Sequence, residues 1–281
     1  MVTPFDQKGN IDFSKTEKLV NYLIANGSDA LIVCGTTGES PTLTTEEKLA
    51  MFQFVVEKTD GRIPIIAGTG GNNTYASVEL TKKATVLGVD GIMAVVPYYN
   101  RPSQDGLYAH FQEIAEATTL PVMLYNVPGR TSVNMTAETT IALSEIANIT
   151  SVKEASENLE QIGEIIERTE DDFRVYSGDD SLTLPVMAIG GDGVVSVASH
   201  IIGNEMQTMI QAFKRGDVHQ AAGLHRSLLP AMKSLFIAPN PTCVKVALQL
   251  KGLDVGSVRL PLVPPGVEQR QTIAAKLNEL E

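Results

Sequence analysis

The sequence predicts an α/β protein, namely a (β/α)8 TIM barrel with a C-terminal helical appendage. Short apolar runs rich in β-branched residues recur along the chain, and amphipathic stretches with apolar residues at helical spacing separate them. The repeat of about 20 to 30 residues is the period of successive βα units in a parallel sheet. Eight such units in a row favour a closed barrel over an open doubly wound sheet, whose GxGxxG motif the chain lacks.

The expected strands are apolar runs of a length and composition typical of strands buried on both faces. They are ALIVCG from residue 30, IPIIAGT from 63, GIMAVVP from 91, PVMLYN from 121, ITSVKEA from 149, FRVYSGD from 173 and GVVSV from 193. Counting the opening MVTPF as the remains of a first strand gives eight.

Helices are expected between these runs, over residues 44–59, 76–88 and 107–118. Residues 203–251 are also strongly helical, and a final helix is expected from Val267. A minimal barrel needs about 250 residues, so the chain has a surplus at its C-terminal end. We therefore predict a barrel over residues 1–216 and a C-terminal helical region over residues 217–281.

The composition excludes several classes of protein. The chain has 281 residues, 43% of them hydrophobic, which is enough for one large core. No apolar run could cross a bilayer and no signal peptide is visible, so we expect a cytoplasmic protein without a membrane partner. The net charge of −11 comes from interspersed acids and bases, which argues against a nucleic-acid partner. Two distant cysteines and four histidines without paired spacing predict no metal site.

Lys153 is the first candidate for chemistry, because it lies inside a predicted strand and near its carboxyl end, where barrel active sites are built. A desolvated lysine that loses its proton is an amine nucleophile toward carbonyl groups, which indicates Schiff-base chemistry. The competing interpretation is that Lys153 points outward or pairs with Glu154 or Glu157.

Tyrosines form the second signal, since Tyr98, Tyr99 and Tyr125 follow neighbouring strands. Phenols can move protons onto and off a carbonyl that forms an imine, and Thr36 or Thr37 could extend the relay. Each tyrosine could equally be ordinary amphipathic packing at a strand end.

Arg130 follows the tight VPG turn, and its planar donor fork suits a carboxylate-bearing substrate. It could also be a surface arginine in a loop. The GTTGES loop offers hydroxyls and N–H groups to an anion, and GGDGVVSV could be a phosphate cradle, although both are also usual in plain turns.

Five motifs carry a family resemblance through their order and spacing. They are GTTGES (35–40), PYYNRPSQDG (97–106), YNVPGRT (125–131), VKEAS (152–156) and YSGDD (176–180). Together they resemble the dihydrodipicolinate synthase family of pyruvate-dependent class I aldolase-like lyases, over essentially the whole chain. The resemblance implies condensation of pyruvate with L-aspartate 4-semialdehyde to 4-hydroxy-tetrahydrodipicolinate, the branch-point step of lysine and diaminopimelate synthesis.

The resemblance also implies catalytic roles. Lys153 would form the Schiff base with pyruvate, without a metal or nucleotide cofactor. Thr36, Tyr99 and Tyr125 would relay protons, and a neighbouring subunit would donate Tyr99. The family is usually a homotetramer built as a dimer of dimers, which we therefore expect of this chain.

Substrate-binding roles follow from the same resemblance. Thr37 would hold the pyruvate carboxylate, and Arg130 would receive the carboxylate of the semialdehyde. The backbone at Gly178 and Val195 would line the site.

A possible allosteric site for L-lysine is matched only in part. Three residues match it: Ser40, Asn72 and Tyr98. Lysine-inhibited relatives have histidines in place of Thr45 and Lys48, and an acid in place of Ala76. We therefore predict weak or absent inhibition by L-lysine.

Two other departures from the family are visible. The chain opens at MVTPF, where relatives have several more residues, so an incomplete amino terminus is expected. Glu157 stands where a glycine is common, so the loop after Lys153 could differ. The alternatives to this function are N-acetylneuraminate lyase or another pyruvate Schiff-base aldolase, a phosphate-handling barrel isomerase, and a catalytically silent homologue.

Overall fold

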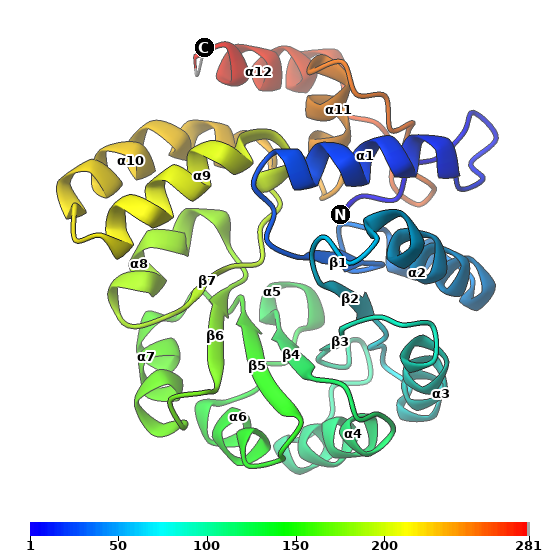
Figure 1. Cartoon of the computed structure of the whole chain (residues 1–281), viewed down its shortest axis with the longest axis vertical. Helices are drawn as coiled ribbons and strands as arrows, with labels where there is room; N and C mark the ends of the chain where they lie inside the picture. Colours follow the sequence, from blue (N-terminus) through cyan, green and yellow to red (C-terminus); the bar gives the residue numbers. More distant parts are fainter. Residues whose placement is uncertain (280–281) are drawn as a thin grey trace. The chain divides into compact units, whose positions relative to one another are not determined.

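A computed structural model of the chain describes residues 1–279. Strands and helices alternate along the chain, as the sequence predicts (Figure 1). The chain divides into two compact units, one from Pro64 to Val195 and the other formed by Met1–Ile63 and the described residues from Ser196 onward. The C-terminal helices therefore share a unit with the first 63 residues, while the division at residue 216 stays a prediction.

A parallel sheet lies at the centre of the Pro64–Val195 unit. Its strands are β2 (Ile65–Gly68), β3 (Gly91–Val95), β4 (Val122–Asn126), β5 (Ile149–Glu154), β6 (Arg174–Ser177) and β7 (Gly193–Val194). Each strand pairs with the next along the chain, so Tyr125 is in register with Lys153, and Lys153 with Tyr176. Parallel strands in chain order bring all their carboxyl ends to one edge.

The helices of this unit cover the outer face of its sheet (Figure 1). They are α3 (Thr74–Thr85), α4 (Gln104–Glu116), α6 (Ala137–Ser144), α7 (Leu159–Arg168) and α8 (Thr183–Ala188). Two short turns, α5 (Pro128–Thr131) and η2 (Asp180–Leu182), follow β4 and β6 and are not part of this outer layer. Helix α4 illustrates why the covering helices form. The Ser103 side chain caps its first turn by accepting from the Gly106 N–H. Leu107, Phe111 and Ile114 then give it one fully buried stripe.

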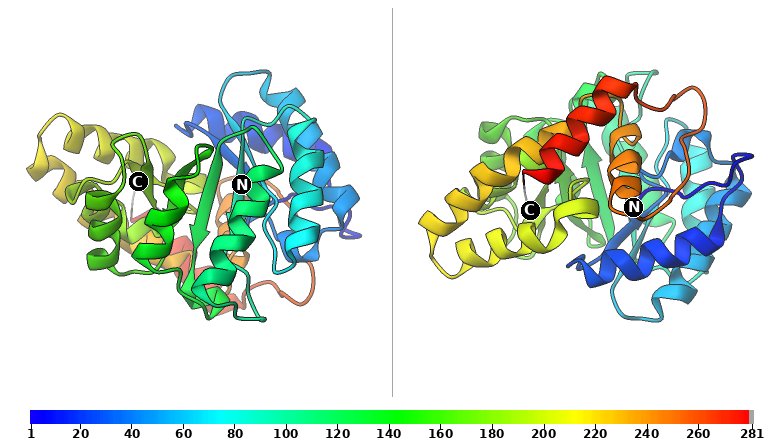
Figure 2. Two further views of the ribbon diagram at one scale, coloured as in Figure 1. Left: turned by 90° about the horizontal axis from the view of Figure 1, so that it is seen from below. Right: turned by 90° about the horizontal axis from the view of Figure 1, so that it is seen from above.

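The other unit is largely helical. It contains α1 (Phe13–Ala25), β1 (Leu31–Val33), η1 (Ser40–Thr42), α2 (Thr45–Thr59), α9 (Ser199–Lys214), α10 (Val218–Ser234), α11 (Thr242–Leu250) and α12 (Val267–Asn278). Helices α9 and α10 lie side by side, and α11 packs against α12 (Figure 2). A capping box between Thr44 and Glu47 begins α2. The helices predicted over residues 44–59 and from Val267 are confirmed.

The opening MVTPF does not form the predicted first strand. In the described chain Phe5 makes only an isolated antiparallel bridge to Ile11. The Met1 amino group donates to the Ile32 carbonyl of β1 at 2.7 Å, so the segment starts beside β1. Pro4 has no N–H to continue a ladder, which is a physical reason for the missing strand.

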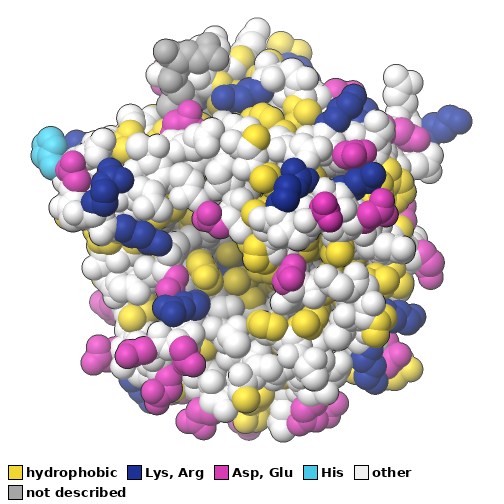
Figure 3. Space-filling model, viewed as in Figure 1, with side chains coloured by type: hydrophobic (Ala, Val, Ile, Leu, Met, Phe, Trp, Pro, Cys, Tyr) yellow, Lys and Arg dark blue, Asp and Glu magenta, His cyan; other side chains and the backbone are white. Residues whose placement is uncertain are grey.

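Acidic and basic side chains alternate over the upper part of the face drawn in Figure 3, and acidic side chains predominate along its lower edge. Within residues 1–279, no helix combines the length and the apolar character that crossing a membrane requires.

Candidate active site

Lys153 lies near the carboxyl end of β5, and only 9% of its surface is exposed. Its Nζ lies 4.1 Å from the ring centroid of Tyr125, its register partner on β4. No carboxylate of the described chain lies within the 4.0 Å of an ion pair to this Nζ. The strand therefore holds a buried amino group against a buried phenol, with no acidic partner in direct contact.

Glu154 does not supply a counter-ion, because consecutive strand residues point to opposite faces. Its carboxylate instead accepts from the Asn126 Nδ2 at 3.0 Å, from the Ser156 N–H at 2.9 Å and from the Gln161 Nε2 at 3.1 Å. Burial raises the pKa of Glu154 against the effect of these donors. The interpretation in which Lys153 pairs with Glu154 is therefore wrong.

Arg130 lies on α5, which Pro128 begins, and its side chain is exposed. Asp179 follows β6, and its Oδ2 is buried without a hydrogen-bond partner. Burial and the nearby Glu157 carboxylate raise the pKa of Asp179 to about 6, although Lys153 and Arg130 act in the opposite direction. A carboxyl group that titrates near pH 6 thus belongs to the same electrostatic environment as the buried lysine.

Gly178 and Val195 continue the hydrogen bonding of the sheet at this edge. The Gly178 N–H donates to the Glu154 carbonyl at 2.7 Å, and the Val195 N–H donates to the Ser177 carbonyl at 2.9 Å. A Cβ at Gly178 would lie 2.5 Å from the Cβ of Ala155, so only glycine fits there. Both predicted lining positions therefore lie at the edge that carries Lys153.

Tyr98 and Tyr99 follow β3, and Asn72, which is expected at the allosteric site with Tyr98, follows β2. Asn72 Nδ2 donates to the Tyr98 carbonyl at 3.1 Å, and Asn100 Nδ2 donates to the Asn72 carbonyl at 2.8 Å. Tyr99 has φ +75°, in the left-handed region, and its side chain is 90% exposed. The tyrosine predicted to be a relay residue thus points into solvent in the single chain.

Thr36, Thr37 and Ser40 belong to the other unit, in the GTTGES loop after β1. The loop is a tight turn, in which the Gly38 N–H donates to the Gly35 carbonyl and the Glu39 N–H donates to the Thr36 carbonyl, each at 3.0 Å. Both threonines are half-buried.

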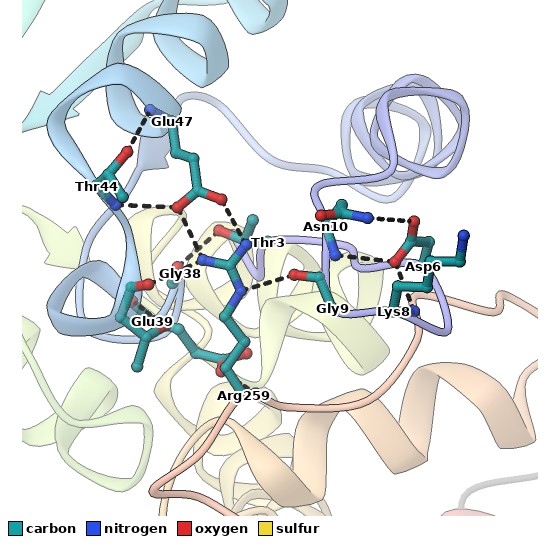
Figure 4. Close-up of polar contacts among 11 residues, drawn as sticks. Thr3, Asp6, Lys8, Gly9, Asn10, Gly38, Glu39, Thr44, Glu47 and Arg259 are labelled. Atoms are coloured by element: carbon teal, nitrogen blue, oxygen red, sulfur yellow. Dashed lines mark hydrogen bonds and ion pairs between the residues drawn. The ribbon is translucent and has the colours of Figure 1, made fainter.

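A buried ionic cluster anchors this loop through Glu39. The Lys245 Nζ of α11 lies 2.6 Å from the Glu39 Oε1, and both side chains are at most 2% exposed. The Arg259 N–H donates to the Glu39 Oε2 at 2.9 Å, and its guanidinium donates to Glu47 at 2.8 Å (Figure 4). Thr3 adds a bond to the Gly38 carbonyl at 2.6 Å (Figure 4).

Asn240 is a further contact of the loop that the sequence did not indicate. It immediately precedes Pro241 and α11, is 7% exposed, and its Nδ2 donates to the Thr37 Oγ1 at 2.9 Å. Lys245 was missed as well, although it is the only charged residue of the apolar stretch TCVKVALQL. Lys153 was identified by a different signal, its position inside a predicted strand near the carboxyl end.

The GGDG segment is not placed as a phosphate cradle. It precedes β7, so it lies at the amino end of the strand and not at the carboxyl edge where barrels bind phosphate. Its Asp192 carboxylate accepts from the Val175 N–H at 2.8 Å and from Arg174 at 3.1 Å. Within residues 1–279, no group of three or more His, Cys, Asp or Glu side chains could hold a metal ion.

Comparisons with known proteins identify the family of the chain. The model of the Dihydrodipicolinate synthetase family matches residues 1–280. The 4-hydroxy-tetrahydrodipicolinate synthase 2 of Halalkalibacterium halodurans is 65% identical, over 100% of this chain and 96% of its own length.

Solved structures extend the likeness to the fold. A dihydrodipicolinate synthase of Bacillus anthracis has a TM-score of 0.98 and 61% identity, covering 99% of this chain and 95% of its own. The enzyme of Cyanidioschyzon merolae, solved with lysine bound, has a TM-score of 0.98 and 48% identity over the same shares. A structure described as the first monomeric dihydrodipicolinate synthase variant has a TM-score of 0.96 and 41% identity, over 99% and 94%. The predicted TIM barrel with C-terminal helices is confirmed.

Proposed function

The chain belongs to the dihydrodipicolinate synthetase family and condenses pyruvate with L-aspartate 4-semialdehyde, and we propose that Lys153 is the residue that forms the Schiff base. The observation that carries this proposal is the position of its amino group. It is buried beside Tyr125 and lacks a carboxylate within ion-pair distance in the described chain. An amino group held at this edge of the sheet without a carboxylate partner can reach the carbonyl carbon of a bound keto acid, which is what imine formation requires.

The chemistry then follows from that amine. The Lys153 Nζ attacks C2 of pyruvate, and the resulting carbinolamine loses water to give the imine. Loss of a proton from C3 gives an enamine, whose C3 attacks the aldehyde carbon of the semialdehyde. The amino group of the bound semialdehyde then displaces Nζ from C2, which closes the ring and frees the lysine.

Each of these steps moves a proton, and we assign that work to Tyr125, Thr36 and Tyr99. The contact of the Tyr125 ring with the Lys153 Nζ at 4.1 Å supports the first assignment. Thr36 and Tyr99 are assigned by their positions in the GTTGES and PYYNRPSQDG motifs. The 90% exposure of Tyr99 supports donation to a neighbouring subunit, and hence a homotetramer as the working form. A light-scattering mass of one chain together with full activity would contradict this.

Two residues are assigned to the two substrate carboxylates, Thr37 to pyruvate and Arg130 to the semialdehyde. The backbone of Gly178 and Val195 lines the site. No cofactor is required, because the imine supplies the electron sink. We propose that the reaction takes place in the cytoplasm.

The activity is tested by following consumption of the semialdehyde with and without pyruvate, alongside a sugar aldehyde as the competing acceptor. Turnover with the semialdehyde only is the expected result. Preference for the sugar aldehyde would indicate a lyase of the N-acetylneuraminate type instead.

The role of Arg130 is tested with Arg130→Ala. We expect KM for the semialdehyde to rise about 10- to 100-fold, the size of lost charge-assisted hydrogen bonds, with little change in KM for pyruvate. Arg168→Ala, at an exposed i,i+4 pair with Glu164, is the matched control and should change neither. Equal rises for both substrates would reassign Arg130.

Regulation by L-lysine is proposed to be weak or absent. Ser40, Asn72 and Tyr98 keep the polar groups of an allosteric site, but Ala76 is exposed and offers no acid for the lysine ammonium. Strong inhibition at submillimolar L-lysine in the same assay would contradict this proposal.

A further inference from the structure

We propose that Asn240 is a positioning residue, which orients the Thr37 hydroxyl so that its proton points to the pyruvate carboxylate. The inference rests on the proposed role of Thr37. It concerns one hydrogen bond, from the Asn240 Nδ2 to the Thr37 Oγ1, 2.9 Å long and spanning 203 residues of sequence.

The direction of this hydrogen bond is what matters chemically. A threonine hydroxyl has one proton to donate and two lone pairs to accept with. When Asn240 donates to the oxygen, it occupies a lone pair and leaves the proton available. The carboxylate of a keto acid is a pure acceptor, so it needs a hydroxyl in this donating orientation.

The environment of Asn240 holds the amide in place. The residue is 7% exposed and lies two residues before α11, the helix that carries Lys245. Lys245 is ion-paired to Glu39 at 2.6 Å, two residues after Thr37 in the loop. The segment from Asn240 to Lys245 therefore contacts the loop twice. Lys245 pairs with Glu39 and anchors the loop, and Asn240 donates to Thr37 and orients its hydroxyl.

The other half of the amide is unused. The Asn240 Oδ1 is buried and has no hydrogen-bond partner in the described chain. An unsatisfied buried acceptor is costly, so a residue selected only for packing would not carry one. We therefore attribute the presence of an amide at this position to its N–H donor, which contacts Thr37.

The test compares Asn240→Ala with the nearly isosteric Asn240→Asp. Removing the donor should raise KM for pyruvate about fivefold, the size of one net hydrogen bond, while kcat and KM for the semialdehyde stay within about twofold. The ionised Asp side chain only accepts, so it would turn the Thr37 proton away from the substrate. Its KM for pyruvate should therefore exceed that of the Ala variant, and a value equal to or below it would overturn the proposal.

A double-mutant cycle with Thr37→Val separates orientation from general packing. Asn240→Ala should have no further effect on KM for pyruvate once the hydroxyl is gone, and a fivefold rise in that background too would overturn the proposal. Asn21→Ala is the control, because Asn21 lies in the same unit, accepts from Arg62 at the surface and should leave KM unchanged.

The wild-type chain is first treated with pyruvate and borohydride. An adduct in the wild type supports the proposed function independently of the results for the Asn240 variants. A wild type that forms none would instead remove the proposed function itself.

Discussion

Two buried lysines, one in each unit, have opposite surroundings. Lys245 is 2% exposed and has the Glu39 carboxylate at 2.6 Å and the Ser257 carbonyl at 2.8 Å. Lys153 is 9% exposed and has no carboxylate within 4.0 Å in the described chain. Each amino group lies over an aromatic ring, that of Phe5 at 4.2 Å for Lys245 and that of Tyr125 at 4.1 Å for Lys153.

Burial alone does not make a lysine reactive. Burial lowers the pKa of Lys245 to about 8, while the Glu39 carboxylate acts to raise it and holds the ammonium form in place. An ammonium in an ion pair has no lone pair for a carbonyl carbon. The two lysines therefore differ in whether a carboxylate engages the amino group, as Glu39 does for Lys245.

The largest expected difference between the two lysines is in their effect on catalysis. Lys153→Ala should lower kcat by at least about a thousandfold, because no other amine at the site can form the imine. Lys153→Arg keeps a cation in place but cannot form an imine with pyruvate, so it should be equally inactive. Recovery of turnover in the Arg variant would show that Lys153 acts only through its charge.

The next effect is on stability. Lys245→Met leaves the Glu39 carboxylate buried without its partner, so the free energy of unfolding should fall by about 3–5 kcal/mol. Lys245→Met combined with Glu39→Gln leaves no unpaired charge and should regain most of this loss in urea titrations. A single variant as stable as the wild type would contradict the structural role of Lys245.

A smaller effect concerns His200, a base buried in the same unit as Lys245 but kept neutral. Its Nε2 accepts from the Val2 N–H at 3.1 Å, and its Nδ1 is 2.8 Å from the Val197 carbonyl. Burial, with the N-terminal amino group, lowers the pKa of His200 to about 3, from 6.5 in the unfolded chain. Below pH 6.5 the unfolded state therefore binds more protons, and stability falls as the pH drops toward 3.

At pH 5 this linkage removes about 2 kcal/mol relative to neutral pH. His110, whose pKa burial lowers to about 4, adds a similar share from the other unit. Unfolding of His200→Asn should depend less steeply on pH between 5 and 6.5 than unfolding of the wild type. Identical slopes would show that His200 is not held neutral.

The smallest effect concerns Glu157, whose φ of +59° lies in the left-handed region that favours glycine. Glu157→Gly should raise the free energy of unfolding by about 0.5–1 kcal/mol, because glycine adopts this backbone without steric cost. Glu157→Ala keeps the Cβ and should gain nothing, which makes it the matched control in thermal unfolding. A gain in the Ala variant equal to that in the Gly variant would assign the effect to charge instead.

The sequence predicted those features that depend on residues close together in the chain. The β-branched runs identified β1 to β7, and the strand position of Lys153 identified the nucleophile candidate, because both signals lie within a few residues. MVTPF was assigned too simply, since an apolar composition does not show that Pro4 interrupts a ladder.

Long-range partners could not be predicted in this way. Asn240 contacts Thr37 across 203 residues, and the helix that carries Lys245 was recognised only as helical. An isolated charge in an apolar helix indicates that a partner exists, but it does not say which residue it is. The left-handed backbone at Glu157 was not predicted either, because a glutamate does not indicate a positive φ.

The measurement that tests the central claim most directly is borohydride reduction of the protein after incubation with pyruvate, followed by peptide mapping. We expect one adduct, on Lys153, and an unmodified Lys245 in the same digest. An adduct on Lys245, or none on Lys153 in folded protein, would contradict the assignment of Lys153, and not the ion-paired Lys245, as the nucleophile.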